Sequence, residues 1–268
     1  MKYSVLLVIL ITFNGYSQGK IDGFYRGQGK GTAVLGFGFE DSKKYFAGRT
    51  KINLSRNLFY ANLYSAYGIT NNLDAQVSIP YLISDDNMNL QDISLFVKYR
   101  FYKKQIENGN FQMSFGAGFS TPLSDYAIGD LNDLGQQATI IETRAMLHYQ
   151  SNSNWFGTLQ SGFSFKLEEV PNSFPFALKV GKASEKWYYD VYYEYQYSFG
   201  GTDYLGSPRP QNFKEFGVDY HKVGGTIFRP ISKNLGAYVS ISYLLKGRNS
   251  FQGAAYGLGL SYDFRTAK

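Results

Sequence analysis

The sequence predicts an all-β fold, namely a transmembrane antiparallel up-and-down β-barrel of about 12 strands that follows an N-terminal signal peptide. From about Thr32 to Phe264, apolar and polar residues alternate in a series of short segments, as they do in strands with one lipid-facing and one lumen-facing side. The segments are joined by turns that are alternately short and long, which is typical of outer-membrane barrels. After residue 17 the chain has no apolar run long enough for a spanning helix, and only helices and closed barrels satisfy all backbone hydrogen bonds in lipid.

Residues 1–17 have the pattern of a secretory signal peptide. Lys2 precedes an apolar run over 5–13, and Gly15 and Ser17 supply small residues at positions −3 and −1 of a cut after Ser17. An N-terminal membrane anchor would need roughly 20 apolar residues. We therefore expect residues 18–268 to form a single outer-membrane β-barrel domain.

The composition agrees with a barrel and excludes several other classes. The chain contains 24 Tyr, 22 Phe and 29 Gly, yet its mean hydropathy is only −0.29, because each lipid-facing residue alternates with a lumen-facing one. Removal of Lys2 with the signal lowers the formal charge from +6 to +5, and such a mild basic excess does not indicate nucleic-acid binding. The absence of cysteine excludes disulfides and thiolate sites.

The alternation is clearest between residues 187 and 199. One face of this segment carries Trp187, Tyr189, Val191, Tyr193, Tyr195, Tyr197 and Phe199, and the other carries Asp190, Glu194, Gln196 and Ser198. Comparable splits predict strands over 92–101, 111–120 and 141–149. Weaker patterns predict the remaining strands near 32–39, 57–67, 73–81, 155–167, 174–180, 216–223, 237–245 and 254–264.

The connections divide into two classes. We expect short turns near 70–72, 104–110, 151–154, 181–186 and 230–234, and longer loops near 40–57, 84–91, 121–136, 168–173 and 200–214, with a short last one near 246–250. Short turns face the periplasm in such barrels, so both termini should be periplasmic. Pro80 cannot donate to a ladder, and a bulge or the outer rim is expected there.

A soluble β-sandwich or lipocalin-like barrel would also show short alternating strands. The apolar face of such a fold points inward, however, and would not normally place stripes of Tyr, Phe and Trp on so many strands. The alternation therefore favours a membrane barrel.

One hairpin resembles a known family. Residues 67–74, with the sequence YGITNNLD, are followed by VSIPY over 77–81, and this pair is similar to a recurrent hairpin of the outer-membrane proteins called putative phenol-degradation meta-pathway, or transporter-like, barrels. The signal ending Tyr16-Ser17-Gln18 resembles those of Bacteroidota. The resemblance implies an outer-membrane channel that in some members is thought to admit small hydrophobic or aromatic compounds, and it transfers no binding residue to this chain.

Strand parity assigns a mixed set of polar and charged side chains to the lumen. They are Asp74, Gln76, Lys98, Arg100, Glu142, Arg144, His148, Lys166, Lys179, Asp190, Glu194, Asp219 and His221. The presence of both acidic and basic side chains argues against a pore for acidic sugars and allows ion pairs across the lumen. These residues either line a pathway or simply solvate and plug a polar interior. Tyr188 and Tyr192 could offer a stacking surface or could serve as packing.

The sequence gives little indication of a catalytic site or a metal site. An outer-membrane acyl hydrolase needs His and Ser on one strand face, whereas His148 and Ser151 lie three apart and therefore on opposite faces. With His148 and His221 as the chain's two histidines and no cysteine, we expect no transition-metal site and no cofactor. Carboxylates at 85 and 86, or 130 and 133, could hold Ca²⁺, but a solvated loop is the simpler interpretation. Residues 27–31 (GQGKG) precede a strand and so are not a phosphate loop.

We therefore expect a non-enzymatic channel or porin for passive passage of small molecules in a bacterial outer membrane. A non-conducting structural or surface-interaction barrel is the alternative, and an acyl hydrolase is disfavoured. The expected partners are outer-membrane lipid, the barrel-assembly machinery and small solutes. Gly253, Gly257 and Gly259 share one face of the final segment, but parity points that face inward, so a monomer is expected.

Overall fold

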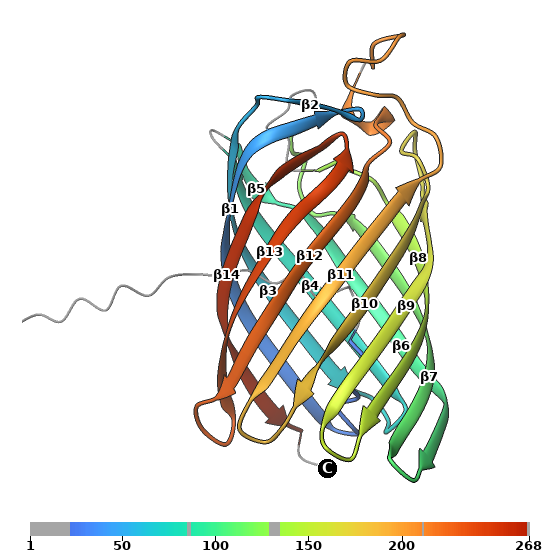
Figure 1. The fold of residues 1–268 in the computed structure, drawn as a ribbon, viewed down its shortest axis with the longest axis vertical. Helices are drawn as coiled ribbons and strands as arrows, with labels where there is room; N and C mark the ends of the chain where they lie inside the picture. Colours follow the sequence, from blue (N-terminus) through green and yellow to red (C-terminus); the bar gives the residue numbers. More distant parts are fainter. Residues whose placement is uncertain (1–21, 85–86, 129–134, 211, 267–268) are drawn as a thin grey trace, which may run out of the picture.

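The computed structural model describes residues 22–84, 87–128, 135–210 and 212–266, and these form a closed antiparallel barrel of 12 wall strands (Figure 1). The wall strands are β1 (Lys30–Ala47), β3 (Arg56–Gly68), β4 (Leu73–Ser84), β6 (Asp92–Ile106), β7 (Gly109–Pro122), β8 (Ile140–Ser151), β9 (Trp155–Lys166), β10 (Ser173–Ala183), β11 (Tyr188–Ser198), β12 (Asp219–Pro230), β13 (Leu235–Arg248) and β14 (Ser250–Arg265). Two short strands, β2 (Thr50–Ile52) and β5 (Asn87–Leu90), extend hairpins beyond the wall. The predicted fold class and strand number are confirmed.

The barrel closes between its first and last strands. β1 pairs with β3 on one side and with β14 on the other, in a ladder that runs from Lys30 opposite Arg265 to Phe46 opposite Ser250. Every other wall strand pairs with its sequence neighbours. A sheet closed in this way has no edge, which is what allows backbone polar groups to be paired inside lipid.

The two ends of the barrel differ in their connections. The links over 69–72, 107–108, 152–154, 184–187 and 231–234 are short, and they lie at the same end as the start of β1 and the end of β14 (Figure 1). The long links that follow β7 and β11 leave and rejoin the wall at the opposite end. Because short turns face the periplasm in such barrels, we call these the inner and outer ends.

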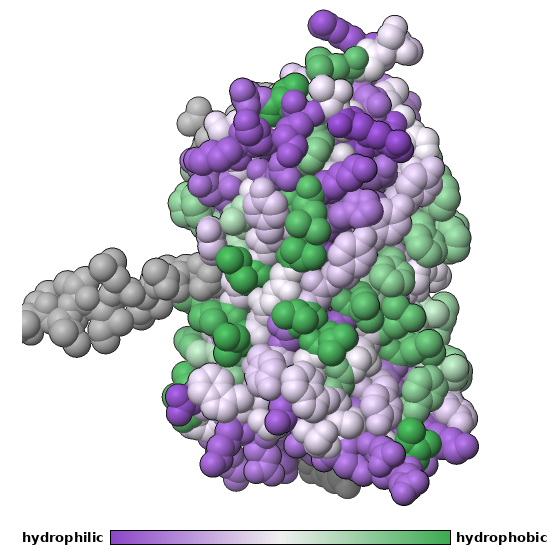
Figure 2. All heavy atoms as spheres, in the orientation of Figure 1, coloured by the Kyte–Doolittle hydropathy of each residue, from purple (hydrophilic) through white to green (hydrophobic). Residues whose placement is uncertain are grey.

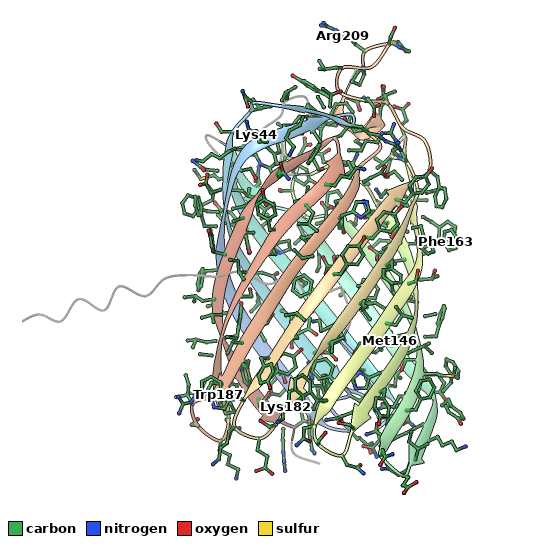
Figure 3. All side chains as sticks on the ribbon, viewed as in Figure 1. Lys44, Met146, Phe163, Lys182, Trp187 and Arg209 are labelled. Carbon is green, nitrogen blue, oxygen red and sulfur yellow. The ribbon has the colours of Figure 1, made fainter. Side chains whose placement is uncertain are left out.

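Side chains alternate between a lipid-facing and a lumen-facing surface. On β11, Val191 is 67% exposed whereas Asp190 and Tyr192 are 4% and 5% exposed. On the face seen in Figure 2, hydrophobic residues gather across the middle of the barrel, between more hydrophilic ends. Trp187 at the inner end and Phe163 on the wall both project outward (Figure 3). The apolar surface is therefore the one that meets lipid.

The first strand is longer than the sequence indicates. Residues 40–47, expected within a loop, continue β1 in register with β14 and then turn into β2. A register shift between Ser42 and Lys44 interrupts the alternation. Because a β-bulge breaks the two-residue period, the pattern did not predict this part of the strand. Similarly, the strand expected over 216–223 begins at Asp219 and runs to Pro230.

Pro80 lies where one ladder is interrupted. Pairing between β4 and β6 stops at Ser78 opposite Ser94, and the next backbone bond, from Gln91 N–H to the Pro80 carbonyl, is displaced by one residue. This break agrees with the expectation for a residue that lacks an N–H.

The expected signal peptide and its cleavage site lie outside the described residues. Within the part of the chain that the structure describes, no helix is long and apolar enough to cross a membrane.

The lipid-facing surface can be tested with a charge on β11. Val191→Arg should lower the free energy of unfolding by about 2–4 kcal/mol, since an arginine near the bilayer midplane is destabilising. Ile231→Arg is the control, because Ile231 is similarly exposed, at 65% against 67% for Val191, but lies in an inner turn. Both values would be measured by urea unfolding in lipid vesicles, and equal losses would contradict the assigned band.

Candidate functional site

The segment 22–29, which precedes β1, lies inside the barrel at its inner end. The chain turns from the lumen into β1 at Gly27 and Gly29, whose φ angles are +81° and +72°, and Lys30 N–H donates to the Gly27 carbonyl at 3.2 Å. A Cβ on the facing Gly68 would lie 2.1 Å from the Gly27 carbonyl oxygen. The glycine run over 27–31 therefore serves a tight turn, for which left-handed backbone angles are required.

Lys98 on β6 holds this segment. Its ammonium group is fully buried and donates to the Asp22 carbonyl at 2.8 Å, to Asp22 Oδ1 at 3.0 Å and to the Phe24 carbonyl. Asp74 Oδ2 on β4 lies 3.8 Å from the same nitrogen and accepts from Arg26 N–H at 3.1 Å. Arg26 in turn forms an ion pair with Asp22 at 2.8 Å. Two cations and two carboxylates thus neutralise one another inside the lumen, as buried charges must.

The electrostatics of this segment favour the charged forms. Burial alone would raise the pKa of Asp22, but attraction to Lys98 and Arg26, with hydrogen bonds to the carboxylate, holds that pKa well below its usual range. Attraction to Asp22 raises the pKa of Arg26. Burial raises the pKa of Tyr25 to about 12, and its neutral hydroxyl donates to Ser114 at 2.8 Å.

Aromatic contacts complete the attachment. Phe24 packs edge-on against His148 and Phe156, with ring centroids 4.8 and 5.0 Å apart. The Tyr25 ring receives Lys98 and Arg100, each 4.5 Å from its centroid. The segment is therefore attached within the inner end of the lumen by side chains from β6, β8 and β9.

The outer loops fold over the opposite end. Tyr126, in the link between β7 and β8, is 2% exposed and packs with Leu82, Leu58, Tyr60 and Ile128. Its hydroxyl donates to Asp92 at 2.6 Å. This loop is joined to the link between β11 and β12 because Gln136 Nε2 donates to the carbonyls of Phe213 and Phe216 at 3.1 and 3.2 Å.

Asn249 ties three outer segments together. It lies at the turn between β13 and β14 with a φ of +48°. Its side-chain oxygen accepts from Gly48 N–H at 2.8 Å, and its amide nitrogen donates to the carbonyls of Thr202 and Gly217, each at 2.9 Å. The adjacent Arg248 bonds Asp203 and the Gly200 carbonyl. The hairpin β1–β2, the link between β11 and β12 and the last turn thus form one cap.

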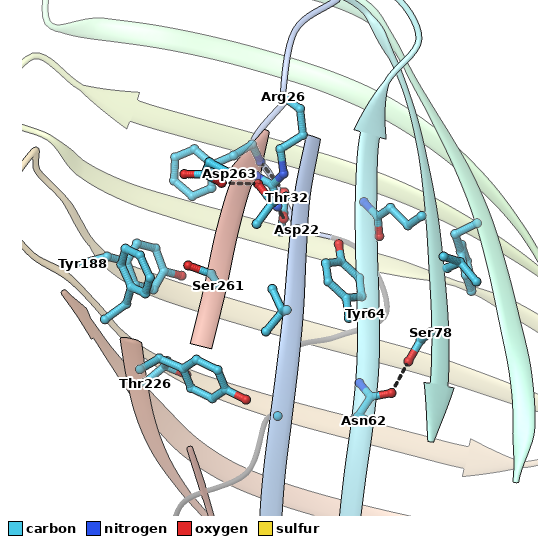
Figure 4. Close-up of a pocket in the computed structure, with 18 of the residues that line it drawn as sticks. Asp22, Arg26, Thr32, Asn62, Tyr64, Ser78, Tyr188, Thr226, Ser261 and Asp263 are labelled. Carbon is cyan, nitrogen blue, oxygen red and sulfur yellow. Dashed lines mark hydrogen bonds and ion pairs between the residues drawn. The ribbon is translucent and has the colours of Figure 1, made fainter. Parts of the chain in front are cut away.

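A cavity of about 650 Å³ lies in the lumen beside the N-terminal segment, and the wall strands and the inner turn before β11 line it (Figure 4). Rings and aliphatic side chains provide most of its wall. These are Phe24, Val34, Tyr60, Tyr64, Phe96, Tyr188, Phe228 and Tyr238. Polar and charged side chains also line it, namely Asp22, Arg26, Thr32, Asn62, Gln76, Ser78, Ser94, Ser184, Thr226, Ser261 and Asp263. Two of these, Gln76 and Thr226, are 6% and 2% exposed, and among the described residues neither amide atom of Gln76 nor the Thr226 hydroxyl has a hydrogen-bond partner. The cavity thus combines an apolar, ring-rich wall with polar groups, two of which are unsatisfied, as small-molecule sites commonly do.

Most residues assigned to the lumen by parity are inside. Those buried on the inner face are Asp74, Gln76, Lys98, Glu142, Arg144, His148, Lys179, Asp190 and Glu194. Several form ion pairs, with Arg144 2.5 Å from Glu142 and Lys179 3.4 Å from Asp190. Arg100 lies at the inner end, where it donates to Gln112 at 2.8 Å. Lys166 lies at the outer end of β9. Gln76 lines the cavity, whereas the ion pairs hold other parts of the lumen.

Two assignments to the lumen are wrong. Glu194 pairs in register with Lys222, and the two form an ion pair at 2.8 Å inside the barrel. His221 therefore lies opposite the outward Tyr195, and Asp219 shares its face. This strand has polar residues on both faces, followed by two adjacent glycines at 224 and 225. It therefore lacks the alternating pattern that distinguishes the lumen-facing from the lipid-facing side.

Of the two tyrosines considered as a stacking surface, Tyr188 lines the cavity. The other rings of the cavity and the position of the segment 22–29 were not predicted from the sequence. Tyr60 and Tyr64 flank Asn62 on one strand face, so parity could have placed them inside had Asn62 been taken as lumen-facing. The segment 22–29 has no periodicity that could reveal its position.

The structure gives no support to a hydrolase site. His148 Nδ1 is bonded to Thr158 Oγ1 at 2.7 Å, while Ser151 bonds Ser153 at the inner turn. The described residues contain no cluster of three metal-ligating side chains. The carboxylates at 85, 86, 130 and 133, considered for Ca²⁺, lie outside the described residues.

Comparison with known proteins identifies the family of the chain. The model of the family described as putative MetA-pathway of phenol degradation matches residues 18–260. The chain belongs to this family. A comparison with curated proteins gave no match.

Two solved structures share the fold. An outer membrane channel from Pseudomonas putida F1 has a TM-score of 0.72 at 12% identity, with 91% of this chain and 99% of that chain covered. The NanC porin has a TM-score of 0.57 at 11% identity, with 86% and 98% covered. The chain is thus an outer-membrane β-barrel of a family whose fold is shared with channels and porins.

Replacing Lys98 tests what holds the N-terminal segment. Lys98→Met leaves Asp22 and Asp74 without their common cation, so the segment should leave the lumen and trypsin should cut after Arg26 at least tenfold faster than in the wild type. Lys179→Met is the matched control, because it removes a buried lysine from a different ion pair. The cut is scored by mass spectrometry of the intact protein, and equal protection in both variants would refute the anchoring role.

The docked segment should tolerate mild acid. Since the pKa of Asp22 is lowered in the folded state, its contribution to docking is complete above its ordinary value of about 3.9 and is lost progressively as the pH falls below it. The segment should therefore be protected from trypsin at neutral pH. Below about pH 3 it should be released and cut by pepsin. Release between about pH 5 and 7 would show that another titrating group controls docking.

Proposed function

We propose that this barrel passively conducts small molecules of apolar or aromatic character across the outer membrane and catalyses no reaction. The observation that carries the proposal is the ring-lined cavity within the lumen. An apolar solute would displace weakly bound water from the cavity walls. Gln76 and Thr226 would form hydrogen bonds with a hydroxyl or carbonyl on that solute. Membership of the family and a fold shared with channels support this function.

Passage requires the inner end to open. The segment 22–29 is attached by side-chain contacts and by single bonds such as that from Arg26 N–H to Asp74, and it belongs to no β-ladder. Rotation about the Gly27–Gly29 turn would move it without breaking the wall. A solute-sized path would then connect the cavity to the periplasm.

The second candidate is a non-conducting barrel. It is favoured by the same segment and by the lumenal ion pairs, because a 12-stranded interior lies between the filled 8-stranded and the open 16-stranded case. In that case the linked outer loops would be the functional surface.

Single-channel recording separates the two candidates. In a planar bilayer we expect stable current steps that a single-ring aromatic alcohol blocks and glucose does not. Tyr238→Ala should weaken the block roughly five- to tenfold, since a lost ring contact removes about 1 kcal/mol. Tyr189→Ala is the matched control, because Tyr189 faces lipid and is 39% exposed.

The outcomes are distinct. A silent bilayer with verified insertion would support the non-conducting barrel. Steps blocked equally by glucose, or equal effects of the two tyrosine variants, would refute the assignment of the solute class to this cavity.

A further inference from the structure

The lipid-facing surface carries a basic and aromatic patch near its outer end, over β11, β12 and β13. Tyr195, His221 and Lys246 follow one another across these strands in register. The next row toward the membrane is Tyr193, Val223 and Tyr243. Tyrosines at this level are the usual aromatic belt between lipid tails and headgroups, but a histidine and a lysine beside them are not required by a belt.

The patch is ordered by specific contacts. The Tyr193 hydroxyl lies 2.7 Å from His221 Nδ1, and the Tyr195 ring lies 4.8 Å from the imidazole. When Tyr193 donates to Nδ1, the neutral imidazole carries its proton on Nε2 and retains one hydrogen bond to give. Arg49 follows Gly48 in the hairpin between β1 and β2, and Gly48 N–H donates to Asn249 in the turn after β13 at 2.8 Å. Arg49 is thereby placed near the outer end of β13, within electrostatic range of Tyr195, as a second permanent cation.

The cations of the patch outnumber its neighbouring carboxylate. Lys246 and Arg49 are exposed, and among the described residues neither forms an ion pair. Asp219, which accepts the Ser198 N–H at 2.7 Å, also acts on Tyr195 and offsets one of the two positive charges. The patch therefore presents a net positive charge and several hydrogen-bond donors.

Its height on the barrel selects the ligand. Directly below lie the lipid-facing Val191, Ile227 and Ile241, which are 67%, 49% and 52% exposed. Figure 2 shows this hydrophobic band and the hydrophilic cap above it. The outer leaflet of a bacterial outer membrane consists of lipopolysaccharide, whose lipid A part places phosphates directly above its acyl chains. A lipid A phosphate would thus meet the cations while its chains cover the apolar rows.

We propose that Arg49, His221 and Lys246 form a binding site for a phosphate group of lipid A. Charge-assisted bonds from the arginine and lysine supply most of the attraction, and Tyr193 fixes the orientation of the histidine. The site lies on the outside of the wall and does not depend on whether the lumen conducts.

The test measures lipid binding by native mass spectrometry of the protein refolded in detergent. Bisphosphorylated lipid A should remain bound to the wild type, and Arg49→Gln with Lys246→Gln should lower its apparent affinity about tenfold or more. The matched control, Lys103→Gln with Lys104→Gln, removes two exposed cations from β6 at the inner end and should have no effect. Because the altered side chains are exposed, folding is verified by electrophoretic mobility before and after heating.

Three further arms identify the source of the phosphate. Dephosphorylated lipid A should bind the wild type as weakly as lipid A binds the double variant. Phosphatidylglycerol and inorganic phosphate, each at equal concentration, should not displace lipid A. Unchanged binding by the double variant, equal loss in the control, or equal competition by either anion would overturn the site, and none of these outcomes bears on conduction.

Discussion

The arrangement of the lumen depends on the neutralisation of one buried charge. Lys98 projects into the barrel with no exposure to solvent, and an isolated ammonium group there would be very costly. The wall supplies Asp74, but its carboxylate lies 3.8 Å away. The closer partners, the Asp22 carboxylate and two backbone carbonyls, come from the N-terminal segment. The charge therefore places that segment inside the barrel and narrows its inner end.

Chain segments narrow the barrel interior at both ends, and the ring-lined cavity lies beside the inner one. At the inner end Phe24 brings a ring against the wall, and at the outer end Tyr126 does the same from a long loop. The ion pairs of β8, β10 and β11 satisfy charges elsewhere in the lumen, so they need not face the cavity. Mixed lumenal charge and an aromatic site are thus compatible within one barrel.

Much of the fold was predictable because membrane strands obey a period of two. The strand with Val191 was clear, since both of its faces are uniform in character. Alternating polarity does not predict the strand where a bulge shifts the register, as at Ser42, or where both faces are polar, as around His221. The cavity was less predictable, because it depends on long-range contacts of Asp22 and Phe24, neither of which lies in a strand.

The most direct test is zero-length cross-linking of the unmodified protein with a carbodiimide, which joins a carboxylate to an ammonium group in contact with it. The account predicts an amide between Lys98 and Asp22, whose charged atoms are 3.0 Å apart, found by mass spectrometry of the peptides. Lys179 and Asp190, 3.4 Å apart in the same lumen, provide the internal reference. If that reference pair is joined but no peptide containing Asp22 is linked to Lys98, the segment does not occupy the lumen, and Lys98 does not hold it there.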